Sequence, residues 1–384
     1  MEENKLIINI YTIIGIAAIT QGIFLGLYMF VKKRAHKTRA YLLGFLLLIF
    51  AFILIHDVLS YSRYMISVPY FLGLGPVFTF AIGPLIFLYV RFICIKGIRL
   101  KWVDFLHFIP TLFVFINRIE LFLLQKEEKV RKLQNAYVYL DSNQKSNQTI
   151  VEAFQHFTIW HIQPFIYLLL SLVLIYKYNN YIKQYFSDIS KLQLSWMKNL
   201  LFGYLLIWGI ESSIELFPVV FNLESVYSKP VSIVLMSLHV FLFVIIALNH
   251  TDESIGVTID QFDKKEKKTI ELPDEEIESL RFKIKNAFKS DKLYHNPKLT
   301  LRKLSDTVAV NSKQVSYIIN HIEHKNFFDF VNDYRVEEAK LLLEDDDYYK
   351  YTIAAIGEMV GFNSRDAFYR AFKKKYGRTP ASFR

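Results

Sequence analysis

The chain of 384 residues contains a single cysteine, Cys94. One cysteine cannot form an internal disulfide or a cysteine zinc site, and its place at the end of an apolar run indicates a small packing residue. Catalytic signatures are absent as well, because there is no Walker A loop, no protein-kinase signature set and no Gly-x-Ser-x-Gly elbow. No spacing of His, Asp and Glu is typical of a metal site. We therefore expect no enzyme activity, no metal and no other cofactor.

Apolar residues are abundant, at 53% of the chain, with 34 Phe and 24 Tyr. About 20 apolar residues suffice to cross the hydrocarbon core of a bilayer. The leader MEENK is acidic-leaning, and no small-residue cleavage site follows the first run, so we do not interpret that run as a signal peptide. Buried core helices are the alternative, but seven runs with charge-sorted loops favour membrane spans. The spans are predicted near Leu6–Val31, Ala40–Ser60, Val68–Ile95, Val103–Leu124, Phe157–Tyr176, Met197–Phe221 and Val231–Leu248.

Basic residues divide the loops into two classes. They are frequent after spans one and three and between spans five and six, whereas the opposite short loops carry only Lys5, Arg63 and Lys229. By the positive-inside rule, the N-terminus is predicted outside and the C-terminus in the cytoplasm. The membrane is expected to be the inner, cytoplasmic membrane of the cell. The long loop near Gln125–His156 is predicted outside despite five basic residues, because it also holds acidic ones. The basic residues on the cytoplasmic side are Lys32, Lys33, Arg34, Lys37, Arg39, Arg91, Lys96, Arg99, Lys101, Lys177, Lys183, Lys191 and Lys198.

The polar tail predicts a separate cytoplasmic domain. Because both the apolar spans and the patterns of the tail predict helices, the whole chain is expected to be all-α. Residues 1–248 are the predicted seven-span domain, residues 249–273 a linker with the charge run DKKEKK, and residues 274–384 a second domain with its core at 299–384. At the start of the tail, Ile277, Leu280, Ile284 and Phe288 recur at helical spacing. This pattern predicts a helix that packs on the domain that follows.

A first helix-turn-helix is predicted from Leu299 to about Asn320. Thr300 can cap its first helix, and Asn311 can cap its second, with Gln314 as a capping-box partner. A recognition helix needs one apolar face that holds it to its scaffold and one polar face that reaches base edges and phosphates. Here the apolar stripe is Val315, Ile318, Ile319 and Ile322, and the polar stripe is Lys313, Ser316, Tyr317 and Asn320.

The same pattern recurs about 52 residues later. Thr352 can cap the first helix, Gly361 tolerates the positive φ of a turn, and Asn363 can cap the second recognition helix. A longer helix, Phe327–Leu343, is predicted to join the two units about one groove repeat, roughly 34 Å, apart. Lys373, Lys374 and Lys375 suit phosphate contacts more than base contacts. In the second recognition helix Ala367, Phe368, Ala371 and Phe372 are predicted to pack inward, and Arg365, Asp366, Tyr369, Arg370 and Lys373 to face outward.

The stretch Leu299–Arg384 resembles the DNA-binding domain of AraC/XylS-family transcription regulators. The resemblance rests on LTLRKLSDTVAVNSKQVSYIIN, FFDFVNDYRVEEAKLLL and IAAIGEMVGFNSRDAFYRAFKKKYGRTPASFR. Ser305 and Gly357 depart from it, because the family usually has alanine at both places. The seven-span front half is similar in architecture to membrane-bound regulators of this type in some bacteria. The resemblance implies two helix-turn-helix units that bind promoter DNA, with base-facing positions at Lys313, Ser316, Tyr317, Arg365, Asp366, Tyr369 and Arg370.

Polar residues inside the predicted spans remain to be explained. Glu211 and Glu215 lie one helical turn apart in span six, and His239 lies in span seven. An unpaired charge in a span is expensive, so three interpretations stay open: helix–helix pairing, a pocket for a ligand or ion, and a proton relay. We take these three residues as the candidate signal pocket.

Two functions from different classes fit the whole chain. A one-component sensor would couple a membrane or extracytoplasmic signal to promoter binding, with DNA, the lipid bilayer and RNA polymerase as partners. The alternative is a transporter or membrane enzyme with an autoregulatory DNA-binding tail, although no inverted repeat is detectable. A passive membrane tether is a third possibility. The signal (a ligand or a membrane partner) stays open, and a homodimer is compatible with the sequence.

Overall fold

The computed structural model of the protein describes residues 6–31, 37–141, 150–220, 228–249, 257–258 and 272–384. Apart from two strands of two residues each, β1 (Ile95–Lys96) and β2 (Val257–Thr258), the regular elements in this part of the chain are helices. The expected all-α class is therefore confirmed. The chain divides into two units, one formed by Met1–Ile175 with Ser195–Gly256, and the other by Tyr176–Leu194 with Val257–Arg384.

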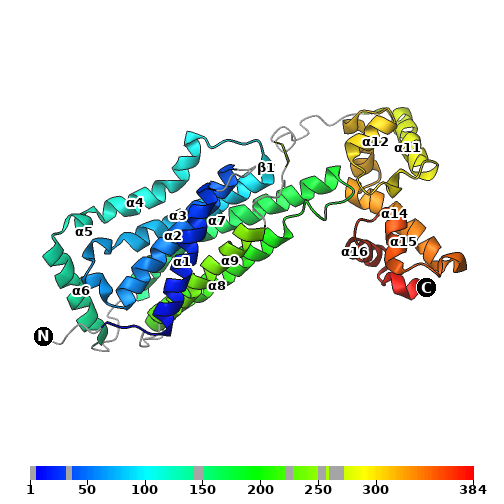
Figure 1. The fold of residues 1–384 in the computed structure, drawn as a ribbon. Coiled ribbons are helices and arrows are strands. Elements are labelled where there is room, and N and C mark those ends of the chain that lie inside the picture. The colour runs from blue at the N-terminus through cyan, green and yellow to red at the C-terminus, as the bar shows by residue number, and fades with distance from the viewer. Residues whose placement is uncertain (1–5, 32–36, 142–149, 221–227, 250–256, 259–271) are drawn as a thin grey trace. The chain divides into compact units, whose positions relative to one another are not determined.

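The first unit is built around helix α2 (Lys37–Tyr61), which contacts α1 (Ile10–Val31), α3 (Leu74–Cys94) and α9 (Ser228–Asn249) (Figure 1). Glycines let α1 and α2 approach closely. A Cβ built on Gly44 would meet the backbone oxygen of Gly26 on the facing helix at 2.9 Å. Small residues at such crossings allow backbones to pack without intervening side chains. Two further helices of this unit are α6 (Lys126–Asp141) and α8 (Ser195–Val220).

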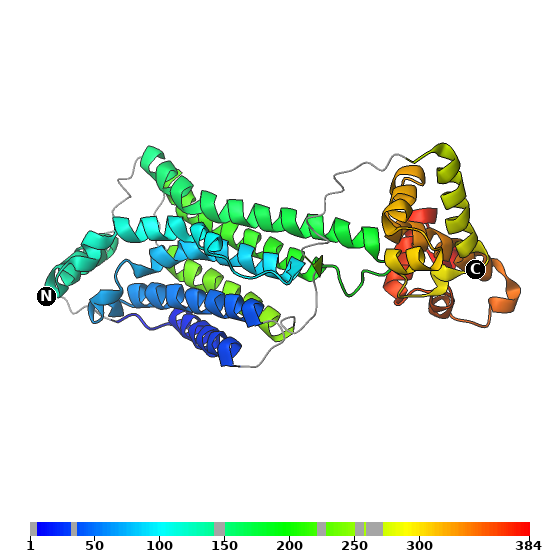
Figure 2. The same cartoon turned by 90° about the horizontal axis from the view of Figure 1, so that it is seen from above.

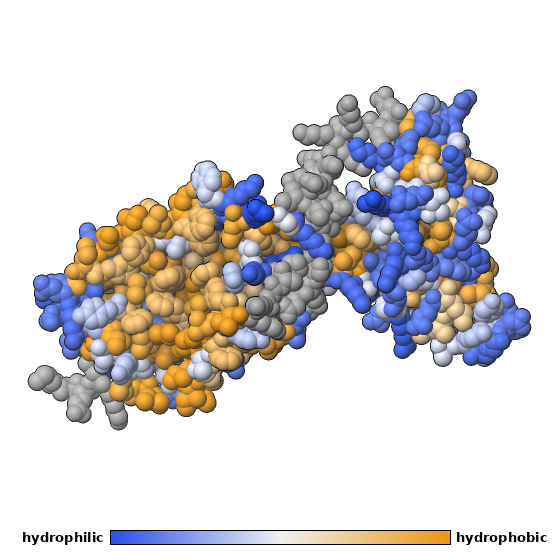
Figure 3. All heavy atoms as spheres, turned by 45° about the horizontal axis from the view of Figure 1, so that its top comes forward, coloured by the Kyte–Doolittle hydropathy of each residue, from blue (hydrophilic) through white to orange (hydrophobic). Residues whose placement is uncertain are grey.

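Five helices of the described residues are long and apolar enough to cross a membrane: Ile10–Val31, Lys37–Tyr61, Leu74–Cys94, Ile162–Tyr185 and Lys229–Ile246. The surface of the first unit is mainly hydrophobic on the face drawn in Figure 3. Helix α1 illustrates this surface, because Phe24 is 70% exposed and Ile13 and Leu27 are exposed beside it. A helix that faces water normally carries polar residues on its outer face.

The fourth predicted span, Val103–Leu124, is not one helix. The structure divides it into a 3₁₀ segment (Trp102–Phe108), α4 (Ile109–Asn117) and α5 (Ile119–Leu123). The breaks have local causes, because Pro110 lacks a backbone N–H and both Phe108 and Arg118 adopt non-helical backbone angles. The sixth predicted span corresponds to α8, whose side chains from Glu215 onward lie outside the described residues.

The second unit contains two hydrophobic cores that share one helix, α14 (Phe327–Glu344). Phe330 and Val331 of α14 belong to the first core, whereas Val336 and Ala339 belong to the second. The first core also holds side chains from α11 (Asp274–Lys289), α12 (Leu301–Thr307) and α13 (Ser312–Tyr317), which a π-helical turn (Ile318–Ile322) extends. The second core adds α15 (Ile353–Met359), α16 (Arg365–Tyr376) and the 3₁₀ turn Pro380–Phe383.

Helix α7 (Ile150–Tyr185) supplies residues to both units, and Figure 2 shows it as a long green helix. The sequence-based division assigned all of residues 1–248 to the membrane domain. In the structure the segment Tyr176–Leu194 instead clusters with the C-terminal unit. This difference arises from contacts more than 100 residues apart along the chain, which no local pattern encodes.

Candidate nucleic-acid interface

The first predicted recognition helix, α13, begins at a capped end. The Oδ1 atom of Asn311 accepts a hydrogen bond from the backbone N–H of Lys313 at 2.9 Å, so the predicted cap is confirmed. Gln314 does not complete a capping box, because its side-chain amide donates instead to Glu276 on α11 at 2.8 Å. The amphipathic helix α11 thereby holds the recognition helix from behind.

The exposed face of α13 is smaller than the sequence predicted. Lys313 is exposed, and Tyr317 and Asn320 are partly exposed. Ser316, however, is only 6% exposed, and its Oγ accepts a hydrogen bond from the Asn320 amide at 3.0 Å. The structure therefore does not place Ser316 on the outer stripe where the sequence predicted it, because its side chain is buried with those of Val315 and Ile319.

The second predicted recognition helix, α16, is capped by Ser364, whose Oγ accepts a hydrogen bond from the backbone N–H of Ala367 at 3.2 Å. The prediction of Asn363 as the cap is wrong by one residue. Asn363 instead donates its side-chain amide to Asp188 at 2.5 Å. The turn before this helix needs glycine, because Gly361 has φ +100° and a Cβ there would meet the backbone oxygen of Tyr294 at 2.6 Å.

The outer face of α16 is cationic. Arg365, Arg370, Lys373 and Lys374 are exposed, and Asp366 is exposed among them. Tyr369 is half-buried, and the guanidinium carbon of Arg365 lies 5.0 Å from the centre of its ring, which is cation–π geometry. Phe368 and Phe372 lie on the opposite face and are fully buried, as predicted. The helix therefore separates a packing face from a polar face as a recognition helix requires.

Ion pairs fix the elements around this face. Lys374 Nζ lies 2.6 Å from Asp329 Oδ1 on α14. Because Lys374 is well exposed, its ammonium group could leave Asp329 and pair with a phosphate. Glu338 on α14 accepts hydrogen bonds from Lys292, at 2.6 Å, and from His295. Burial alone would raise the pKa of the Glu338 carboxyl, but these hydrogen bonds hold it below its ordinary value.

Arg335 is a residue that holds the site together and that sequence reasoning did not single out. It lies at the middle of α14, is 1% exposed, and donates from Nε to the backbone oxygen of Tyr294 at 2.7 Å and from Nη2 to that of Asn296 at 2.9 Å. Burial lowers the pKa of the Arg335 guanidinium to about 10, against the attraction of Asp188. The available signal was its position in the sequence, four residues after Val331 and four before Ala339, on the apolar stripe of the helix.

The candidate signal pocket is only partly described. His239 is 2% exposed, its ring stacks on Phe50 at 5.8 Å between centroids, and the Tyr204 ring lies 4.7 Å away. Glu211 is half-buried on the same helix as Tyr204, within its electrostatic range. The side chain of Glu215 lies outside the described residues. Glu211 and His239 thus share Tyr204 as a neighbour. Among the described residues no cluster of three or more His, Cys, Asp or Glu could hold a metal ion.

A family model described as a helix-turn-helix domain matches residues 304–384. The matched stretch contains most of α12 and all of α13, α14, α15 and α16, the elements that form both recognition units. These residues are similar to an AraC-type helix-turn-helix domain. Domains of this family bind DNA in transcription regulators and are not typically enzymatic. The comparison with curated proteins found no match, and neither did the comparison with solved structures.

Proposed function

We propose that this chain is a membrane-anchored, sequence-specific DNA-binding transcription regulator that couples a membrane or extracytoplasmic signal to promoter binding. The observation that carries the proposal is the pair of capped recognition helices, α13 and α16, built on the shared helix α14. One shared helix gives two recognition helices a defined separation, which two successive segments of the major groove require.

The base-reading residues we propose are Lys313, Tyr317 and Asn320 in the first unit and Arg365, Asp366, Tyr369 and Arg370 in the second. All of them are at least partly exposed on the outer face of their helix. Lys373 and Lys374 lie in the last turns of α16 and suit the phosphate backbone, since a lysine ammonium is a flexible point charge. Ser316 is assigned to packing, where it accepts the amide of Asn320.

The membrane part of the proposal is a seven-span arrangement with the N-terminus outside and the C-terminus in the cytoplasm. The five long apolar helices support insertion, and α8 together with the short helices of residues 102–123 would supply the remaining two spans. A test is a reporter that is active only in the cytoplasm. It should function after Arg384 and fail when inserted near Asn143, and activity at Asn143 would contradict seven spans.

The sensing part of the proposal places the signal at Glu211, Glu215 and His239. Its support is that Glu211 and His239 both lie near Tyr204 in the interior of the first unit. Promoter DNA, the bilayer and RNA polymerase are the partners that this function requires. A homodimer would add a second pair of recognition helices.

Genome-wide mapping of the DNA bound by the protein in cells tests the DNA-binding function directly. The matched control is a chain carrying Arg365→Ala and Arg370→Ala, which removes two cations from the outer face of α16 while its packing face stays intact. Discrete sites that are enriched with the natural chain and lost with the control would support the proposal. Identical maps for both chains would overturn it.

A further inference from the structure

The C-terminal end of α7 together with the loop before α8, Tyr176–Leu194, belongs to the unit that carries both recognition helices. We call it the docking segment. Phe186 forms an antiparallel bridge with Thr300, the residue that caps α12. Ser187 follows, 1% exposed, and donates from its backbone N–H and its Oγ to the backbone oxygen of Leu299, at 3.1 and 2.7 Å. The segment is therefore joined to the first helix-turn-helix by backbone pairing.

The buried guanidinium of Arg335 adds a second anchor. Its Nη1 and Nη2 atoms donate to the backbone oxygen and the Oγ of Ser187, each at 3.3 Å, while Nε and Nη2 hold the backbone before α12. A buried cation that loses a partner leaves an unsatisfied donor, which is costly. The docking segment therefore completes the hydrogen bonding of the most deeply buried charge on α14.

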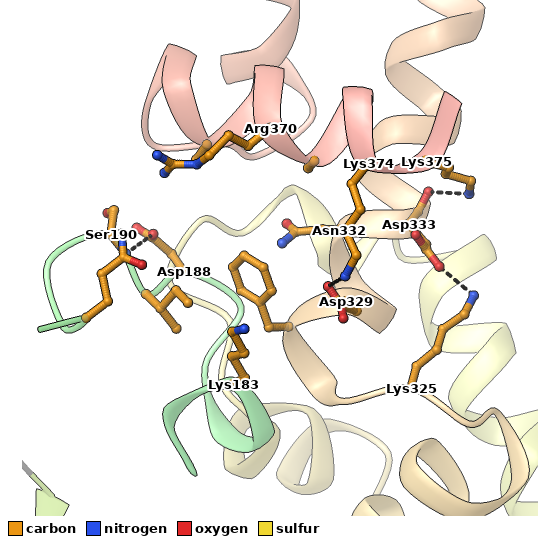
Figure 4. A pocket seen from close by; sticks show the side chains of 15 residues that line it. Lys183, Asp188, Ser190, Lys325, Asp329, Asn332, Asp333, Arg370, Lys374 and Lys375 are labelled. Carbon is orange, nitrogen blue, oxygen red and sulfur yellow. Dashed lines mark hydrogen bonds and ion pairs between the residues drawn. The ribbon is translucent and has the colours of Figure 1, made fainter. Parts of the chain in front are cut away.

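From this anchor the docking segment reaches the second recognition helix. Asp188 accepts the Asn363 amide at 2.5 Å, directly before the capping residue Ser364. Asp188 and Ser190 also line a cavity of about 410 Å³ whose opposite wall includes Arg370 and Lys374 of α16. Figure 4 shows Arg370 extending from α16 toward the side of the pocket where Ser190 and Asp188 lie. The segment thus occupies space beside two cations that we assign to DNA.

The docking segment brings a negative charge, the carboxylate of Asp188, to this place, and a negative charge repels DNA phosphates. Asp188 is the single carboxylate in the sequence of the docking segment, and it lies at the N-terminal end of α16. The N-terminus of a helix attracts anions, because its free N–H groups and its dipole point outward, and DNA phosphates use such places. A carboxylate held there competes with a phosphate for the same favourable position.

We propose that the docking segment is an autoinhibitory contact that holds a carboxylate at the N-terminal end of α16, beside Arg370 and Lys374, until the signal moves α7. This inference rests on the proposed function and adds its mode of regulation. The helix α7 ends at Tyr185, one residue before the bridge at Phe186, so no linker separates the helix from the contact. A shift or rotation of α7 would withdraw Ser187 and Asp188 together, so that Asp188 leaves Asn363 and the negative charge leaves the pocket lined by Arg370.

The first test is the affinity of the full chain in lipid nanodiscs for a promoter fragment recovered from the genome-wide map. Asp188→Asn keeps the side-chain size and removes the charge that competes with phosphate. We expect binding about tenfold tighter than for the natural chain, which corresponds to roughly 1.4 kcal/mol. Asp291→Asn is the matched control, because Asp291 is exposed and its replacement changes the net charge equally. Equal affinities of the Asp188 variant and the natural chain would overturn autoinhibition.

The second test locks the contact. Residues paired in an antiparallel bridge have Cα atoms about 4.5–5.5 Å apart, which is within the range of a disulfide. The chain with Phe186→Cys and Thr300→Cys should form this bond on oxidation, bind the promoter at least about tenfold more weakly, and recover with reductant. Each single variant is a control, and the native Cys94 is buried. A missing disulfide, or unchanged binding once it has formed, contradicts the proposal.

The two proposals fail in different ways. If neither the natural chain nor any variant binds the promoter fragment, with or without reductant, the DNA-binding function itself is wrong. If all of them bind with the same affinity in the oxidised and reduced states, DNA binding stands and only the autoinhibitory contact is wrong.

Discussion

Replacing Gly357 with alanine tests how α15 and α16 pack, and we expect it to destabilise the second helix-turn-helix. The family that this tail resembles usually has alanine here, and alanine is favoured over glycine in a helix by about 1 kcal/mol. The structure predicts the opposite net effect. A Cβ on Gly357 would meet the Cδ1, Cγ and Cβ atoms of Phe368 at 2.7, 2.9 and 3.2 Å. The fully buried Phe368 cannot move its ring base away cheaply.

Overpacking of a well-filled core costs about 1–3 kcal/mol, so the net loss for Gly357→Ala is roughly 1 kcal/mol. Hydrogen exchange of the α16 backbone amides in the full chain measures this local stability, and about fivefold faster exchange is expected. The matched control is Ser305→Ala at the corresponding place in the first unit, where the hydroxyl only donates to the backbone oxygen of Leu301 and no clash arises. Unchanged or slower exchange in the Gly357 variant would refute the packing argument.

Three further predictions concern DNA, pH and the signal. Arg365→Ala should weaken binding to the preferred DNA sequence by about 1–3 kcal/mol. Lys374→Ala should weaken binding to all DNA sequences evenly and reduce the dependence of the affinity on salt concentration, as binding titrations at several salt concentrations would show. The pKa of Glu338 is held below its ordinary value, so its ionised carboxylate contributes to the stability of the fold above about pH 4.5, and this contribution is lost as the pH falls below that value. Urea titrations at several pH values should show that Glu338→Gln reduces the loss of unfolding free energy at acid pH. The same pH dependence in the variant and the natural chain would contradict this role of Glu338. Glu211→Gln should leave the protein level and DNA binding normal but abolish the transcriptional response to the signal, and a normal response would assign Glu211 to helix pairing.

Much of the tail could be predicted because its determinants are local. The caps Asn311 and Thr352 and the buried pair Phe368 and Phe372 follow from residues within one or two helical turns of each other. The predictions were wrong where a residue distant in the sequence determines the burial or the hydrogen-bond partner of a side chain. Ser316 is buried beside the rest of its unit, and Asn363 turns from its own helix to Asp188, a residue 175 positions earlier in the chain.

The sequence by itself determined the helical class, the long apolar helices of the first two-thirds and the two recognition helices of the tail, because hydrophobic period and capping act over short distances. Tertiary structure alone decided that Arg335 is buried and that the docking segment belongs with the DNA-binding unit. The reason is physical. A buried guanidinium needs acceptors from several directions, and chain folding brought one of them, Ser187, from 148 residues away.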